Sequence, residues 1–254
     1  MFRTFERWLV YPAPRRNGDD WVATDLPHQD VHFPAVDGTQ LHGWFVPGPT
    51  GRAPRAAILF CHGNGEHVAR LKPVLQILRD DVGAAVFAWD YRSYGKSQGK
   101  PDENNTISDA RQAQLELARR AGIEPQEVVV LGRSLGGGVA VALAAQYPVR
   151  GLVLDRTFSQ LVETAQVHFP WLPVGRIMRN RYPSIERIQQ YHGPLLQTHG
   201  TDDEVIPFEM GRRLFEAAPT KDKRFIPVEG GTHNSPPPPE SFTALKEFLD
   251  ALPQ

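Results

Sequence analysis

Four short, uninterrupted apolar runs constrain the fold of this chain more than any other feature. They are Ala56 to Cys61, Ala84 to Trp89, Val128 to Leu131 and Gly151 to Leu154. A strand with one face in water alternates apolar and polar residues, whereas a strand covered by helices on both faces is apolar throughout. Helical patterns lie among the runs at about 67–79, 107–121 and 135–146. This alternation predicts an α/β fold with a mostly parallel, doubly wound sheet and helices on both of its faces.

The alternation resumes near the C-terminus after an interruption. Strands are expected at Leu195 to Thr198 and Arg224 to Val228, and helices at Pro207 to Ala217 and Glu240 to Leu252, with Pro207 in a first turn. The interruption, about 157–190, mixes polar residues with large apolar ones and predicts a short lid insertion. Ahead of the apolar runs, the alternating segment Asp30 to Val46, with a turn at Asp37-Gly38, predicts a hairpin or a pair of edge strands.

Length, net charge and cysteine count exclude several classes of protein. Residues 1–254 are expected to form a single domain, with an N-terminal extension at about 1–29. Lys and Arg number 28 against 29 Asp and Glu, and the resulting net charge of -1 argues against a nucleic-acid partner. The single cysteine, Cys61, excludes an intrachain disulfide framework. No apolar run approaches the roughly 20 residues that span a bilayer, so we expect a cytoplasmic protein.

The apolar run that ends at Leu131 leads into Gly132-Arg133-Ser134-Leu135-Gly136, which a helical pattern follows. This is G-x-S-x-G at a turn from strand to helix, the context in which the motif marks a nucleophile. Small residues two positions before and after the serine let strand and helix approach each other closely, and the sharp turn exposes the hydroxyl above the sheet. Ser134 is therefore the predicted nucleophile.

A serine hydroxyl needs a base near neutral pH, usually a histidine that a carboxylate orients. In hydrolases built on this turn, the chain order is serine, acid, histidine. The histidines that follow Ser134 are His168, His192, His199 and His233. His233 is the predicted base, because its glycine-rich loop at 229–234 follows the last expected strand. His199 is expected to support the acid loop, and the other two to lie on the surface or the lid.

The acid is expected in the loop after Thr198, where Asp202, Asp203 and Glu204 are adjacent and spacing does not choose among them. Asp155, at the end of an apolar run, is a further candidate, although a role in lining the top of the sheet and fixing the insertion explains it better. Acyl transfer also requires hydrogen-bond donors for the tetrahedral oxyanion. The backbone N–H of Leu135 is one predicted donor. The second is expected from the loop at 62–67, where glycines allow a close approach to the ligand.

In this order the motifs resemble those of the α/β-hydrolase-fold serine hydrolases. The resemblance is greatest to the serine aminopeptidase-like and lysophospholipase-like branch, which includes monoglyceride lipases and depalmitoylating thioesterases. It runs from about Asp30 to Leu252 and depends on the loop at 62–66, the segment DYRSYGKSQG at 90–99 with Pro101, the nucleophile turn and the segment 199–207. It implies an eight-stranded sheet with a short lid.

The resemblance also settles two roles that the spacing leaves open. Counted from the strand-end pair His199-Gly200, the acid of this branch falls on Asp203, and the second oxyanion donor falls on Asn64, directly after His62-Gly63. One departure is Ser93, where the family usually has glycine. We expect this small change to leave the chemistry intact.

The resemblance implies a serine hydrolase that cleaves small-molecule carboxylic esters or thioesters through an acyl-enzyme on Ser134, without metal or organic cofactor. Aromatic and aliphatic residues in the lid favour an apolar acyl group. An acyltransferase, a cofactor-free haloperoxidase and a membrane-associated protein thioesterase are alternatives that use the same triad, and a non-enzymatic binding module is the least favoured. The apolar residues within 2–11 are expected to pack onto the domain, with peripheral membrane contact as the alternative; no oligomeric state is implied.

Overall fold

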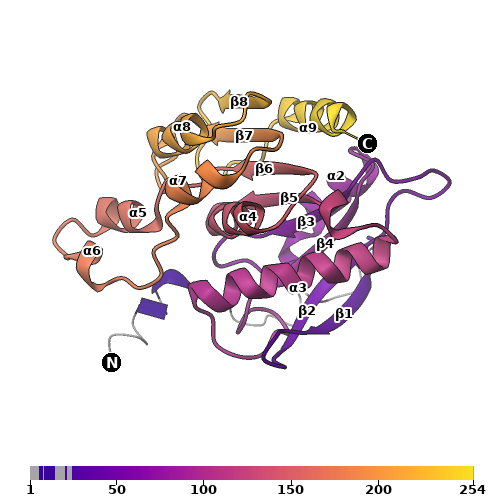
Figure 1. Cartoon of the computed structure of the whole chain (residues 1–254), viewed down its shortest axis with the longest axis horizontal. Helices are drawn as coiled ribbons and strands as arrows, with labels where there is room; N and C mark the ends of the chain where they lie inside the picture. Colours follow the sequence, from indigo (N-terminus) through magenta and orange to yellow (C-terminus); the bar gives the residue numbers. More distant parts are fainter. Residues whose placement is uncertain (1–5, 8, 15–20, 22–24, 254) are drawn as a thin grey trace. The chain divides into compact units, whose positions relative to one another are not determined.

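The computed structural model comprises two compact units, Met1–Val129 and Val130–Gln254, here called the N-terminal and C-terminal units. The structure describes residues 6, 7, 9–14, 21 and 25–253. Figure 1 shows strands and helices alternating along the chain from β3 onward, after the two strands β1 and β2. The predicted single-domain organisation stays a prediction.

The N-terminal unit is built on four strands in the order β1-β2-β4-β3. Their bounds are β1 Gln29–Pro34, β2 Gln40–Val46, β3 Ala57–Cys61 and β4 Ala85–Asp90. Strands β1 and β2 form the predicted antiparallel hairpin, β2 pairs antiparallel with β4, and β3 pairs parallel with β4. Every residue of β3 and β4 is buried, which explains why the sequence of these strands does not alternate.

Helices of this unit begin at positions that differ from the sequence expectation. The 3₁₀ turn η2, Val68–Leu71, precedes α2, Lys72–Asp80, so the regular helix begins later than residue 67. Helix α3, Glu103–Ala121, begins one turn earlier than residue 107. Asp102 accepts a hydrogen bond from the Asn105 N–H at 2.9 Å, and the Asn105 side chain accepts one from the Asp102 N–H. This reciprocal cap uses asparagine where the usual signature has glutamate or glutamine, so the sequence pattern did not mark it. The short turn η3, Pro125–Glu127, follows.

The C-terminal unit contains the strands in the order β5-β6-β7-β8. They are β5 Val129–Arg133, β6 Gly151–Asp155, β7 Leu195–Gly200 and β8 Lys223–Val228, and β6, β7 and β8 pair in parallel. The longer helices are α4 Leu135–Gln146, α8 Phe208–Ala217 and α9 Pro239–Ala251. Pro207 is the residue before α8 rather than part of its first turn, because its ψ of 134° is extended. Each of β5, β6 and β7 continues beyond its predicted apolar run.

The predicted lid forms four short elements between β6 and β7. They are α5 Leu161–His168, α6 Val174–Ile177, α7 Ser184–Arg187 and the 3₁₀ turn η4 Ile188–Gln190. Within this unit, α5 and α6 lie beside each other and away from the strands, whereas α7 packs against α4 and α8 (Figure 1). The insertion is therefore partly anchored in the core and partly projecting.

Eight mostly parallel strands with flanking helices confirm the predicted α/β fold class.

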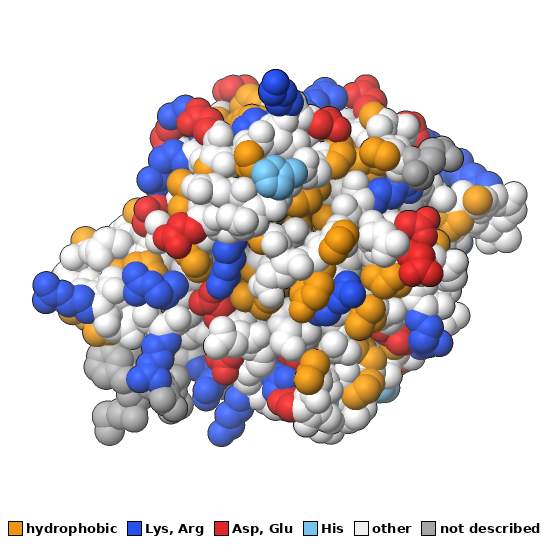
Figure 2. Space-filling model, viewed as in Figure 1, with side chains coloured by type: hydrophobic (Ala, Val, Ile, Leu, Met, Phe, Trp, Pro, Cys, Tyr) orange, Lys and Arg blue, Asp and Glu red, His pale blue; other side chains and the backbone are white. Residues whose placement is uncertain are grey.

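On the face shown in Figure 2, basic and acidic side chains are interspersed, in keeping with a net charge of -1. No helix among the described residues is long and apolar enough to cross a membrane.

The N-terminal apolar residues fall partly outside this description. Phe2, Phe5 and Trp8 lie outside the described residues, whereas Val10 and Tyr11 are buried. Membrane contact through residues 2–11 stays a prediction.

Candidate active site

Ser134 lies at the sharp turn between β5 and α4. Its φ of 53° and ψ of −120° are strained for a residue with a side chain. Three hydrogen bonds hold its backbone: the Ser134 N–H donates to the Asp155 carbonyl at 3.0 Å, and the Ser134 carbonyl accepts from the Gly137 N–H at 2.9 Å and the Thr157 hydroxyl at 2.8 Å. The turn is thus fixed by the neighbouring strand end as well as by its own helix.

Close packing explains the small residues around the serine. A Cβ atom on Gly132 would lie 2.4 Å from the Gly136 carbonyl oxygen and 2.6 Å from the Ala140 Cβ. A Cβ atom on Gly137 would lie 2.2 Å from the Thr157 hydroxyl oxygen. Such distances are well inside van der Waals contact. Gly132 therefore allows β5 and α4 to approach each other, and Gly137 allows α4 to lie against Thr157 after β6.

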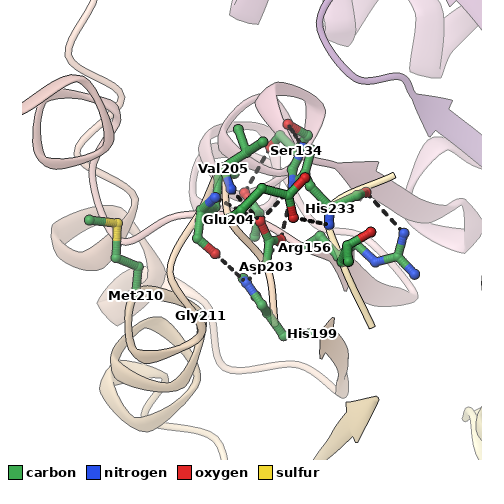
Figure 3. A network of polar contacts seen from close by, with 12 residues as sticks. Ser134, Arg156, His199, Asp203, Glu204, Val205, Met210, Gly211 and His233 are labelled. Atoms are coloured by element: carbon green, nitrogen blue, oxygen red, sulfur yellow. Dashed lines mark hydrogen bonds and ion pairs between the residues drawn. The ribbon is translucent and has the colours of Figure 1, made fainter. Parts of the chain in front are cut away.

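The imidazole of His233 joins Ser134 to Asp203 (Figure 3). The Ser134 Oγ lies 3.0 Å from His233 Nε2, and His233 Nδ1 lies 2.9 Å from Asp203 Oδ2. When Nδ1–H donates to the carboxylate, Nε2 carries the free lone pair and can accept the serine proton. The three residues lie in the turn or loops that follow β5, β7 and β8, and they occur in the order serine, acid, histidine.

Asp203 is buried and strongly hydrogen bonded. Burial by itself would raise its pKa, but hydrogen bonds from His199 and His233, together with the Ile206 N–H, hold the pKa of Asp203 below its usual value. The Ile206 N–H donates to Asp203 Oδ1 at 2.7 Å, and His199 Nε2 lies 3.4 Å from Oδ2. The carboxylate is therefore ionised at neutral pH and able to orient the imidazole.

The other acid candidates occupy different positions. Asp202 is exposed, and the Glu204 carboxylate accepts a hydrogen bond from the His233 N–H at 3.2 Å rather than from its ring. Asp155 accepts from the Thr198 hydroxyl at 2.7 Å and lies 3.7 Å from the Arg156 Nε. Of the four carboxylates considered from the sequence, Asp203 is the one bonded to the His233 ring.

Two of the three remaining histidines of this unit have other partners. His168, exposed on α5, lies 2.8 Å from the Val205 carbonyl oxygen through Nε2. His199 is buried, and its Nε2 lies 2.9 Å from the Ile206 carbonyl oxygen, next to the acid loop. His192 is exposed.

The two predicted oxyanion donors lie in different units. Leu135 is the first residue of α4, and the first N–H groups of a helix have no carbonyl partner within that helix. Asn64 belongs to the N-terminal unit, where its side chain is held on both sides: Oδ1 accepts from the Tyr94 hydroxyl at 2.6 Å, and Nδ2 donates to the Val10 carbonyl at 2.7 Å. Both oxyanion roles stay predictions.

Cys61 ends β3 in the N-terminal unit and is fully buried. Burial raises the pKa of its thiol to about 12. A thiol of this kind is protonated at neutral pH and is a poor nucleophile, in agreement with its predicted structural role.

Comparison with known proteins identifies the family. A family model described as serine aminopeptidase, S33, matches residues 52–186, which is more than half of the chain. The chain belongs to this family. It is 39% identical over 233 residues to the protein Rv2307c of Mycobacterium tuberculosis, covering 91% of this chain and 81% of the relative. It is also 30% identical over 227 residues to the alpha/beta hydrolase domain-containing protein WAV2 of Arabidopsis thaliana, covering 82% of this chain and 73% of the relative.

The fold is shared with solved hydrolases. The esterase Pf2001 of Pyrococcus furiosus superposes with a TM-score of 0.74 at 20% identity, covering 94% of this chain and 99% of the esterase. These findings confirm the resemblance drawn from the sequence motifs, and the chain has an esterase-like α/β-hydrolase fold.

Proposed function

We propose that this protein is a serine hydrolase that cleaves carboxylic esters or thioesters through an acyl-enzyme on Ser134. The observation that carries the proposal is the hydrogen-bonded chain from Ser134 Oγ to His233 Nε2 at 3.0 Å and from His233 Nδ1 to Asp203 Oδ2 at 2.9 Å. Both distances are within the range required for proton transfer and for orientation of the base.

In the first half-reaction, the Ser134 hydroxyl passes its proton to His233 Nε2 while Oγ bonds to the substrate carbonyl carbon. Asp203 holds the imidazole in the tautomer that can accept this proton and stabilises the imidazolium that forms. His233 then donates the proton to the leaving alcohol or thiol, and the acyl group remains on Ser134. The left-handed backbone of Ser134 serves this step because it projects the hydroxyl away from both strand and helix.

In the second half-reaction, a water molecule passes a proton to His233 and attacks the acyl carbon. The carboxylic acid leaves, and Ser134 recovers its proton from His233. The tetrahedral oxyanion of both steps is assigned to the backbone N–H groups of Leu135 and Asn64, each donor lowering the barrier by a few kcal/mol in hydrolases of this kind. Asn64 enters the proposal through the family resemblance.

An apolar acyl group fits the composition of the lid. Val167 on α5 is 50% exposed and Trp171, in the turn after α5, is 76% exposed. Both side chains provide apolar surface on the lid that an apolar acyl group would contact. The Pf2001 esterase, which shares the fold, is named for ester hydrolysis and agrees in reaction class.

Substitutions of the triad test the proposal. Ser134→Ala and His233→Ala are expected to lower kcat for p-nitrophenyl butyrate by about 10⁴-fold or more. Ser134→Ala should also abolish labelling by a fluorophosphonate probe, while both variants keep the circular dichroism spectrum of the wild type. Activity near the wild-type level in either folded variant would remove the assigned residue from the mechanism.

The acid is tested by a matched pair of neighbouring substitutions. Asp203→Asn should lower kcat by roughly 10³- to 10⁴-fold, because the amide favours the wrong imidazole tautomer. Asp202→Asn, one residue away on an exposed side chain, should stay within about twofold of the wild type. The reverse result would transfer the acid to Asp202.

A further inference from the structure

Arg156, directly after β6, combines two properties that are unfavourable for an arginine. Its φ is 48°, in the left-handed region that glycine and asparagine occupy most readily, and the residue is only 1% exposed. Long charged side chains are rarely buried unless other groups compensate their charge and satisfy their hydrogen bonds. A buried guanidinium at this position therefore needs hydrogen-bond acceptors and a compensating negative charge.

The direct hydrogen bonds of the guanidinium go to backbone carbonyls of the loop that carries His233. Arg156 Nη1 donates to the His233 carbonyl at 3.0 Å and also to the Ser235 carbonyl. Arg156 Nε lies 3.7 Å from the Asp155 carboxylate and has no hydrogen-bond partner among the described residues. Asp155 thus compensates charge without a close ion pair, and the strong, charge-assisted bonds are directed to the loop.

The loop between β8 and α9 needs such an anchor. Two glycines, Gly230 and Gly231, precede His233, and Gly230 has a φ of 66°. Glycine adds backbone freedom just upstream of a residue whose ring must keep two hydrogen bonds at once. Turn contacts such as the Gly231 N–H to the Val228 carbonyl at 3.0 Å hold the beginning of the loop.

Charged side chains hold both peptide groups that flank the His233 Cα atom. The Glu204 carboxylate accepts from the His233 N–H at 3.2 Å, and Arg156 binds the His233 carbonyl (Figure 3). Arg133 Nη2 approaches the same carbonyl at 3.5 Å. Glu204 is exposed to solvent whereas Arg156 is buried, so screening by water weakens the first contact far more than the second.

We propose that Arg156 is a positioning residue that fixes the backbone of His233, and thereby keeps its Nε2 at the distance from Ser134 Oγ that proton transfer requires. The inference rests on the proposed function of the triad. Arg156 acts through His233 and is itself too deeply buried to contact substrate. Its removal should allow the histidine loop to move relative to Ser134 while leaving the surfaces that bind the acyl group intact.

Kinetics of Arg156→Met and Arg156→Lys test this role. The methionine variant keeps a long side chain but no donor, and its kcat for p-nitrophenyl butyrate is expected to fall roughly 30- to 100-fold, with KM changed less than about threefold. Lysine keeps a charge and donors on a shorter reach, so it should recover part of this loss. Arg213→Met, which removes a surface ion pair with Glu163 in the same unit, is the matched control and should stay within about twofold.

A measurement without substrate separates this inference from the proposed function. The low-field proton resonance of His233 Nδ1–H, assigned by its absence in His233→Gln, should broaden or disappear in Arg156→Met and persist in Arg213→Met. If the wild type proves to lack esterase activity but the resonance depends on Arg156, the positioning role stands and the proposed reaction falls. If the wild type is active and folded Arg156→Met retains both kcat and the resonance, the positioning role is overturned. Should the methionine variant not fold, Arg156→Gln, which is uncharged and too short to reach both carbonyls, replaces it, and an unchanged kcat and resonance in that variant would overturn the role equally.

Discussion

At the scale of single residues, positive φ values show where backbone strain is retained. The non-glycine residues with a positive φ in the described chain are Ser93, Ser134, Arg156 and Tyr182. A left-handed conformation costs a residue with a side chain roughly 1–2 kcal/mol. At Ser134 this strain projects the proposed nucleophile, and at Arg156 it accompanies the anchor of the histidine loop. No role in the proposed mechanism is assigned to Ser93, which is exposed.

Ser93→Gly should therefore stabilise the protein. The φ of 67° at this position suits glycine, which explains the residue that the family usually has there. Relief of the left-handed strain outweighs the extra chain entropy of glycine in the unfolded state, and we expect the free energy of unfolding to rise by about 0.5 kcal/mol. Urea denaturation measures the change. Ser93→Ala retains the Cβ atom and should give no gain; a gain equal to that of glycine would show that strain is not the cause.

At the scale of elements, the nucleophile turn depends on close approach of β5 and α4. Gly132→Ala would bring a Cβ atom to 2.4 Å from the Gly136 carbonyl oxygen and should lower the free energy of unfolding by roughly 1–3 kcal/mol or more. Esterase activity should fall with it, because the turn carries Ser134. Gly175→Ala, whose new Cβ atom would meet nothing closer than Val162 at 4.0 Å, is the control and should be tolerated. Equal tolerance of both substitutions in urea melts would contradict the close-packing explanation.

Most strands were predictable because a strand that is buried on both faces has an uninterrupted run of apolar residues in its sequence. Helix α4 begins and ends as predicted, and β3 differs from its predicted run by one residue. Errors fall at the ends of elements, and two of them have an identifiable cause. Helix α3 begins at the Asp102–Asn105 cap, and β7 continues through His199 and Gly200 because backbone pairing with β8 extends past the apolar run.

The residues of the candidate site also differ in how far the sequence predicts them. Ser134 and His233 follow from a motif and a glycine-rich loop, whereas the family resemblance was needed to choose Asp203 from three adjacent carboxylates. Arg156 and Glu204 were not identified as contacts of the His233 backbone. Arg156 lies 77 residues from His233 in the chain, and a side chain that binds a backbone carbonyl has no periodic or motif signal in a sequence. An arginine directly after Asp155, at the end of a strand, was the only available hint.

At the scale of the whole molecule, the cooperativity of unfolding depends on whether the two units unfold together. Each unit has its own buried strands, and each has a buried aspartate engaged in hydrogen bonds, Asp90 in the first and Asp203 in the second. A chain of this length that forms one domain, as the sequence predicts, should unfold in a single transition. Two independent domains would give two transitions unless their stabilities happened to match.

The positions of the tryptophans allow the unfolding of the two units to be measured separately. Four of the five tryptophans lie in Met1–Val129, and Trp171 is the one in the other unit. Trp171→Phe should change stability little because Trp171 is 76% exposed, and it leaves fluorescence as a probe of the N-terminal unit alone. Pulse labelling of Ser134 by a fluorophosphonate reports the C-terminal unit, and far-ultraviolet circular dichroism reports both. We expect the three urea transitions of this variant to coincide within about 0.2 M, as in the wild type. Loss of labelling and of part of the dichroism while the fluorescence stays native would show that the C-terminal unit unfolds independently, and the chain would then consist of two domains.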